Sequence, residues 1–218
     1  MRPTQKIINA IVLLFALSPV IYLLIVWNSV PETIITRFNF NEPETKEITR
    51  QTLLVSSIVN SAIAAALYFL LRNLRRVDPK VKSDTPVAGF NRMGLSATVF
   101  LILLNYFVIL SAIHSWEISQ NILFIFFGLL VAVLGNYMYN IKPNYFAGIR
   151  LPWTLNDENN WRQTHHLTGK LWFSAGIILA LISWFLPDAA LKPVFIVVMV
   201  LIVLIPGIYS YRLFKRKT

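Results

Sequence analysis

The chemically most varied segment of this sequence is residues 144–170, NYFAGIRLPWTLNDENNWRQTHHLTGK, which we call the polar block. It contains two adjacent histidines, His165 and His166, whose imidazole rings suit proton transfer and metal binding. Neighbouring residues of a helix point about 100° apart, so this pair cannot grip one metal ion from a single helix face. Because the chain has no cysteine and no His-x3-His spacing, we expect no metal. It also lacks a Gly-x-Ser-x-Gly elbow and a Walker-type loop, so we expect no cofactor and no catalytic residue. A general acid or base at either histidine is the alternative that would make the protein an enzyme.

The local sequence of the polar block predicts turns followed by a helix. Pro152 enforces a turn, and Gly148 permits a backbone conformation that other residues resist. Thr154 and Asp157 have the spacing of a capping box, and the acidic side chain would oppose the positive end of the helix dipole. We therefore expect a helix over 156–168 that lies at a membrane interface and leads into the apolar segment after it.

The polar block has two interpretations, as a lipid anchor and as a protein-binding surface. Tryptophan and arginine side chains suit the lipid headgroup region, where an apolar body meets a polar edge. The same side chains can instead contact another protein. The binding residues that we expect in the block are Asn144, Gly148, Arg150, Pro152, Trp153, Thr154, Glu158, Trp161, Arg162, Thr164, His165 and Lys170.

The elements that must position this block are apolar helices. The chain of 218 residues is 56% hydrophobic and 14% charged, whereas an average soluble domain has about 25% charged residues. A helix needs about 20 apolar residues to cross the hydrocarbon core of a bilayer. The stretches that qualify, or nearly do, are 7–27, 52–71, 93–113, 118–139, 171–186 and 193–213. We therefore predict an all-α polytopic membrane protein with a six-helix bundle.

The positive charges predict the orientation of these helices. Sixteen of the 20 Lys and Arg residues lie in the two termini and in the second and fourth loops. The remaining four are Arg37, Lys46, Arg50 and Lys192. Because cytoplasmic loops are enriched in Lys and Arg, we expect both termini and the polar block on the cytoplasmic side of the membrane. The net charge of +10 then reflects membrane orientation, and we expect no direct nucleic-acid partner.

Polar and small residues inside the predicted spans give two further expectations. Asn60 and Asn105 lie deep in the second and third spans, where amides usually hydrogen-bond between helices. A polar path through the bundle is the alternative, and it would make the protein a small-solute or lipid transporter or channel. Gly128, Ala132 and Gly135 form a strip of small residues that lets another helix approach closely. A homodimer contact is the second interpretation of that strip.

The longest predicted extracytoplasmic loop is residues 28–51. Pro31 and Pro43 exclude one continuous helix. Alternation of side-chain types between Ile34 and Phe40 predicts a short extended segment. The loop is either an irregular connection or a ligand-facing surface.

The order of residues in the polar block resembles the signature of the SdpI family of bacterial membrane proteins. That signature runs Asn, aromatic, Gly-Ile-Arg, Pro-Trp-Thr-Leu, acidic, Trp, Thr-His and Gly-Lys. Leu151 and His166 depart from it, where Thr and Arg are typical. The residues that fit are Asn144, Phe146, Gly148, Ile149, Arg150, Pro152, Trp153, Thr154, Leu155, Glu158, Trp161, Thr164, His165, Gly169 and Lys170.

The loop 28–51 resembles a degraded copy of an N-terminal module of unknown function that accompanies this family. Arg37 and Glu42 stand where the module has His and Gly. The residues that fit are Val30, Pro31, Ile35, Phe38, Asn39, Pro43 and Glu44. The resemblance therefore divides the chain into a two-span region, 1–92, and an SdpI-like four-span region, 93–218.

The resemblance implies an integral membrane immunity and signalling protein rather than an enzyme. It implies protection of the cell from a secreted toxin peptide that is met on the outer face. It also implies a cytoplasmic transcriptional repressor that is recruited to the membrane. Membrane lipids are the remaining expected partner.

Overall fold

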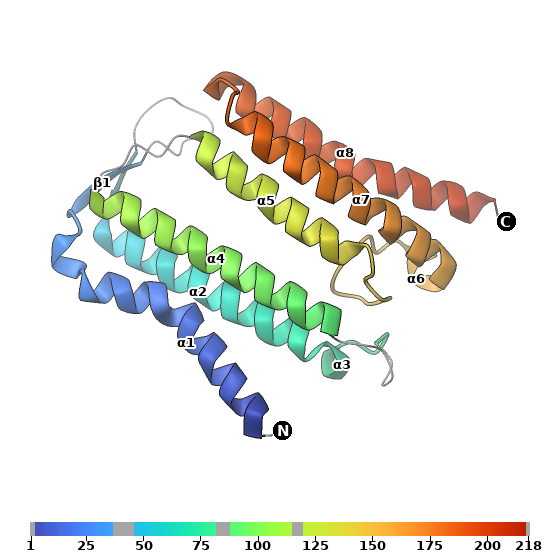
Figure 1. The fold of residues 1–218 in the computed structure, drawn as a ribbon, viewed down its shortest axis with the longest axis horizontal. Coiled ribbons are helices and arrows are strands. Elements are labelled where there is room, and N and C mark those ends of the chain that lie inside the picture. The colour runs from blue at the N-terminus through green and yellow to red at the C-terminus, as the bar shows by residue number, and fades with distance from the viewer. Residues whose placement is uncertain (1–2, 37–45, 82–87, 115–119, 217–218) are drawn as a thin grey trace. The chain divides into compact units, whose positions relative to one another are not determined.

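The structure is a computed structural model that describes residues 3–36, 46–81, 88–114 and 120–216 of the chain. Figure 1 shows that these residues form mainly long α-helices, with one short hairpin. In chain order, the elements are α1 (Pro3–Ile25), the 3₁₀ turn η1 (Trp27–Ser29), β1 (Thr33–Thr36), β2 (Lys46–Thr49), α2 (Arg50–Arg72), α3 (Leu74–Val77), α4 (Ala88–His114), α5 (Gln120–Met138), α6 (Pro152–Asn156), α7 (Glu158–Ser183) and α8 (Asp188–Lys215).

Within the described residues, six helices are long and apolar enough to cross a membrane. They are Gln5–Ile25, Arg50–Arg72, Ala88–His114, Asn121–Met138, Glu158–Ser183 and Asp188–Lys215. The prediction of an all-α polytopic protein with six spans is confirmed. The position of both termini in the cytoplasm stays a prediction.

The helix expected over 156–168 differs from the observed one. It is the first part of α7, which continues without interruption from Glu158 to Ser183. No proline or glycine pair interrupts residues 158–171, so the polar turns and the apolar turns join into one helix. The fifth span therefore begins well before residue 171, where the apolar run begins.

The chain divides into two compact units, which we describe separately. Unit 1 consists of Met1–Phe69 and Gly94–Ser119, and unit 2 consists of Leu70–Met93 and Gln120–Thr218. The third membrane helix, α4, thus packs mainly with α1 and α2. The division at residue 92 that the sequence suggested concerns sequence modules, and it stays a prediction.

Two amide side chains, half-buried Asn60 and buried Asn105, join α2 and α4 inside unit 1. The side-chain Nδ2 of Asn60 donates to the carbonyl oxygen of Leu101 at 3.2 Å, and Nδ2 of Asn105 donates to that of Ser57 at 3.1 Å. Hydrogen bonds of this kind stabilise helix pairs in membranes by about 0.6–2 kcal/mol each. Both amides therefore make hydrogen bonds between helices, which is the structural role that the sequence suggested for them.

The hairpin of unit 1 confirms the first part of the extended segment predicted between Ile34 and Phe40, whose residues after Thr36 lie outside the described part of the chain. β1 and β2 pair antiparallel, with Thr33 opposite Thr49 and Thr36 opposite Lys46. Ile34 is buried and belongs to an apolar cluster that also contains side chains of α1, α2 and α4. The following residues of the proposed N-terminal module lie outside the described part of the chain: Arg37, Phe38, Asn39, Glu42, Pro43 and Glu44.

In unit 2, α5 and α7 are in direct backbone contact, and Figure 1 shows α8 beside α7. A Cβ atom added at Gly128 would lie 2.7 Å from the backbone nitrogen of Ala180, and one added at Gly176 would lie 2.4 Å from that of Ala132. A Cβ atom added at Gly135 would lie 2.4 Å from the backbone nitrogen of Phe173. The close approach predicted for the small-residue strip is confirmed, and α7 is the helix that approaches.

Candidate functional site

The polar block begins with a loop that folds around the side chain of Asn144. This amide is fully buried, and its Nδ2 donates to the carbonyl oxygens of Lys142 (2.8 Å) and Ala147 (3.0 Å). Its Oδ1 accepts from the backbone N–H groups of Phe146 (2.9 Å) and Ala147 (2.6 Å). Because one side chain provides both donors and acceptors, neither a carboxylate nor an apolar residue can replace it without leaving loop groups unpaired.

Gly148 and His165 close the same loop against α7. Gly148 has a φ of 111°, and a Cβ atom there would lie 2.3 Å from His165 Nε2. Nε2 accepts from the backbone N–H of Ile149 at 2.9 Å, and Nδ1 lies 2.7 Å from the carbonyl oxygen of Trp161. These partners assign a neutral imidazole that carries its proton on Nδ1. Nε2 of the buried histidine therefore holds the loop, and Nδ1 fixes the ring on α7.

A short helix, α6, follows the loop and precedes α7, so the cap of α7 differs from the predicted one. Pro152 occupies its first position, which proline favours, so Thr154 lies inside this helix. The hydroxyl of Thr154 accepts from the backbone N–H of Leu151 at 2.9 Å. Asp157 alone caps α7, where its carboxylate accepts from the N–H of Asn159 at 2.9 Å. The predicted pairing of Thr154 with Asp157 is wrong because Thr154 lies in the first turn of α6, whereas Asp157 is the N-cap of the next helix, α7.

Two side chains of the polar block attach it to α8. Trp153 Nε1 donates to the hydroxyl of Ser210 at 3.0 Å, and Asn160 Nδ2 donates to the Ser210 carbonyl at 2.9 Å. The Oδ1 of Asn160 accepts from the Thr164 hydroxyl at 3.0 Å. Asn160 was not among the expected binding residues, although its place between Asp157 and Trp161 is typical of a buried helix-starting turn.

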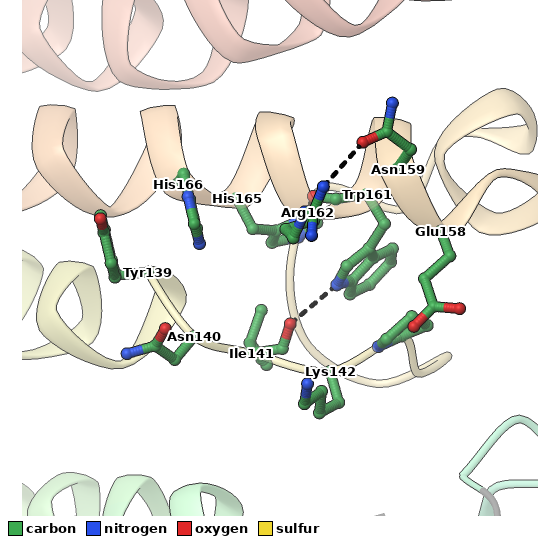
Figure 2. Close-up of a pocket in the computed structure, with 11 residues that line it drawn as sticks. Tyr139, Asn140, Ile141, Lys142, Glu158, Asn159, Trp161, Arg162, His165 and His166 are labelled. Atoms are coloured by element: carbon green, nitrogen blue, oxygen red, sulfur yellow. Dashed lines mark hydrogen bonds between the residues drawn. The ribbon is translucent and has the colours of Figure 1, made fainter.

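A pocket of about 430 Å³ lies beside this loop (Figure 2). Its walls come from residues 139–143, which follow α5, and from the first turns of α7. Trp161 is almost fully buried in one wall, and its Nε1 donates to the carbonyl of Ile141 at 2.9 Å. The rings of Tyr139 and His166 stack in parallel with centroids 4.3 Å apart. The pocket is thus a formed cavity with rigid aromatic walls.

Residues 140–210, which contain nearly all of this geometry, match the sequence model of the SdpI/YfhL protein family. Through this segment, the chain is similar to the SdpI/YfhL protein family. Immunity protein SdpI of Bacillus subtilis (strain 168) is 30% identical to the chain over 89 residues, which cover 41% of this chain and 42% of that relative. The match spans less than half of either protein. No solved structure matches the chain.

The expected binding residues of the polar block separate into buried and exposed groups. The buried group makes hydrogen bonds within the chain and consists of Asn144, Thr154, Trp161, Thr164 and His165. Gly148 and Trp153 are half-buried. The exposed group is Arg150, Pro152, Glu158, Arg162 and Lys170. The exposed group is available for contacts with another molecule, whereas the buried group shapes the surface that carries it. Asn60 and Asn105 belong to unit 1 and take no part in this site.

Metal binding has no support in the described residues. No three His, Asp or Glu side chains there lie close enough together to hold an ion. The absence of a cofactor and of catalysis stays a prediction from the sequence.

Asp78 and Lys80 support the SdpI-family loop from outside the matched segment. The buried carboxylate of Asp78 accepts from the backbone N–H groups of Tyr145 (2.6 Å) and Lys80 (2.8 Å). The Lys80 ammonium donates to the carbonyl of Leu155 and lies 5.7 Å from the centre of the Tyr145 ring. Sequence reasoning missed both residues. The available signal was a pair of acidic residues, Asp78 and Asp84, within a strongly basic loop, and this signal is weak.

Replacing Asp78 with alanine is expected to lower the free energy of unfolding by about 2–3 kcal/mol, because the N–H groups of Tyr145 and Lys80 lose their acceptors. Thermal unfolding of the purified protein in detergent measures the change. Asp78→Asn retains one acceptor oxygen and should lose less. Equal melting temperatures for wild type and Asp78→Ala would show that this carboxylate does not hold the loop.

Proposed function

We propose that this chain is an integral membrane immunity protein that protects a bacterial cell from a secreted peptide toxin. The family match over 140–210 and the similarity to a protein named Immunity protein SdpI support this proposal. The six membrane helices provide the multi-pass anchor that such a protein needs. We further propose that it resides in the cytoplasmic membrane with both termini inside the cell.

The observation that carries the proposal is an exposed face on a rigid support. The side chains of Tyr145 and Phe146 are 45% and 38% exposed, although Asn144 and Asp78 fix the backbone beneath them. Arg150 is also exposed, and its Nη1 donates to the carbonyl of Tyr145 at 2.5 Å. Aromatic and arginine side chains that need little ordering are typical of binding hot spots. We assign this face, defined by Tyr145, Phe146 and Arg150, to the contact with a cytoplasmic repressor.

The toxin contact belongs, in this proposal, to the opposite side of the membrane. The charge asymmetry of the loops favours an extracytoplasmic position for the β1–β2 hairpin. Its exposed residues include Thr33, Glu47 and Thr49. Two strands held by the apolar cluster around Ile34 provide a stable surface for a peptide.

Expression of the chain in a toxin-sensitive bacterium without its own immunity protein tests this function. We expect the wild type to restore survival when the cells are challenged with a secreted toxin peptide of the SdpI-linked type. Arg150→Ala should lower survival, and should lower repressor recruitment at least about thirtyfold at equal membrane levels, as expected for loss of a hot-spot side chain worth at least 2 kcal/mol.

Two comparisons make the result specific. Arg212→Ala removes an exposed cation from α8 and should protect as the wild type does. Phe146→Ala removes a side chain of the proposed face without touching the Arg150 hydrogen bond, so it should resemble Arg150→Ala. Full protection and recruitment by both face variants would exclude this face from the mechanism, and absence of protection by the wild type would contradict the immunity function.

Transport of a small solute or lipid is the alternative function. The amides Asn60 and Asn105 suggested it, but their Nδ2 atoms donate to α2 and α4 backbone carbonyls. These hydrogen bonds between helices do not favour a polar path through the helix bundle. Flux of ions or osmolytes through liposomes that contain the purified protein would support the alternative over the immunity function.

A further inference from the structure

We propose that the pocket between residues 139–143 and the first turns of α7 binds an anionic phosphate ester, with the headgroup of an anionic membrane phospholipid as its source. This site is separate from the exposed face around Arg150 and does not depend on the immunity function. This proposal is supported by the cavity itself, by the cations that line it and by its position at the end of a membrane span.

Two cations line the cavity, Lys142 and Arg162. Both side chains are exposed to solvent in the pocket region. Among the described residues, no hydrogen bond or ion pair engages the Lys142 ammonium. Figure 2 shows the guanidinium of Arg162 bonded to Asn159, whose Oδ1 accepts from Nη2 at 3.1 Å. The remaining N–H groups of this guanidinium are suited to a phosphate, which arginine can bind through two parallel hydrogen bonds.

One acidic residue, Glu158, lines the same cavity. In the described part of the chain, it forms no ion pair with Lys142 or Arg162. The two positive charges are therefore not neutralised by a contact inside the pocket. The amide of Asn140 adds a hydrogen-bond donor to the lining. The net charge of the lining side chains is positive, and it favours an anion.

A second, smaller pocket of about 240 Å³ adjoins the first. The two pockets share Asn140, Ile141 and Lys142, so the lysine borders both cavities. Arg92 lines the second pocket and adds a third cation. The positive potential thus extends beyond one side chain.

The position of the pocket favours a lipid headgroup as the source of the phosphate. The membrane span of α5 ends at Met138, and the pocket wall begins with Tyr139. Headgroups occupy the few ångströms directly outside the hydrocarbon core, where tyrosine and tryptophan are enriched. The volume of about 430 Å³ lies within the usual range for small-molecule sites. A headgroup can therefore enter the cavity while its acyl chains remain beside the helices.

Native mass spectrometry of the full chain in mild detergent tests the proposal. The probes are phosphatidylglycerol, phosphatidylcholine and soluble sn-glycerol 3-phosphate. We expect one phosphatidylglycerol to be retained in preference to phosphatidylcholine. The double variant Lys142→Gln/Arg162→Gln should lower this retention about twenty-five-fold, because each of the two cations near an anionic lipid contributes roughly a factor of five. Thermal unfolding verifies that the variant is folded.

Arg212→Gln is the matched control, because it removes an exposed arginine that does not line the pocket. It should retain the lipid as the wild type does, and an equal loss in this control would overturn the site in favour of diffuse charge attraction. Glu158→Gln should retain at least as much lipid, and a loss would overturn the assignment of an anion. Unchanged retention by the double variant also overturns the proposal. Binding of glycerol phosphate without phosphatidylglycerol would support the phosphate site and overturn the membrane source.

Discussion

Gly148→Ala is expected to lower the free energy of unfolding by about 3 kcal/mol or more, because it combines backbone strain with overpacking. The φ of 111° at this position is rarely adopted by residues with a side chain. The new methyl group would also lie 2.3 Å from His165 Nε2, which already accepts the N–H of Ile149. The histidine has to leave its position, and the loop loses that hydrogen bond.

Thermal unfolding of the purified variant in detergent measures this loss. Gly89→Ala is the matched control, since nothing lies within 4 Å of a Cβ atom there. Because Gly89 lies in α4, alanine should leave the stability unchanged or raise it by about 0.5–1 kcal/mol. The double variant Gly148→Ala/His165→Ala removes the clash but keeps the unfavourable φ, so it separates the two causes. A melting temperature of Gly148→Ala equal to that of the wild type would refute the described loop geometry.

Gly176→Val is the second substitution for which we expect a large effect. A Cβ atom at Gly176 meets the backbone nitrogen of Ala132 at 2.4 Å and the carbonyl oxygen of Gly128 at 2.5 Å. These are main-chain atoms of α5, so they cannot rotate away as a side chain can. The helices must separate, and we expect a loss of about 3 kcal/mol, at the upper end of typical overpacking costs.

Gly207→Val provides the comparison for this substitution. It introduces the same side chain into a membrane helix, α8, at a position where a Cβ atom has no neighbour within 4 Å. We expect Gly176→Val to melt at a lower temperature than Gly207→Val and to accumulate at lower levels in membranes. Equal behaviour of the two valine variants would show that α5 and α7 are not in backbone contact.

The membrane helices could be predicted from the sequence because their signal is local. An apolar run of about 20 residues has few alternatives to a helix in lipid. The boundaries were less predictable, as α7 shows. Its first turns, from Glu158 to Lys170, are polar and give no hydropathy signal, yet a helix continues through them once Asp157 has capped it.

The residues of the candidate site were predictable by type, but their orientations were not. Asn144 and His165 both belong to the expected set, yet each is buried and bonded within the chain. Which way such a side chain points depends on the path of the loop, which no short-range pattern encodes. Asp78 is a clearer case, because its partner Tyr145 is 67 residues away in the sequence.

The attachment of the polar block to α8 sets an order for biogenesis. Trp153 and Asn160 both bond to Ser210, which is translated about fifty residues after them. While the ribosome is still synthesising α8, the block lacks these partners. Both hydrogen bonds form only once α8 lies beside α7. A block that is bonded to Ser210 therefore distinguishes a fully synthesised chain from an unfinished one.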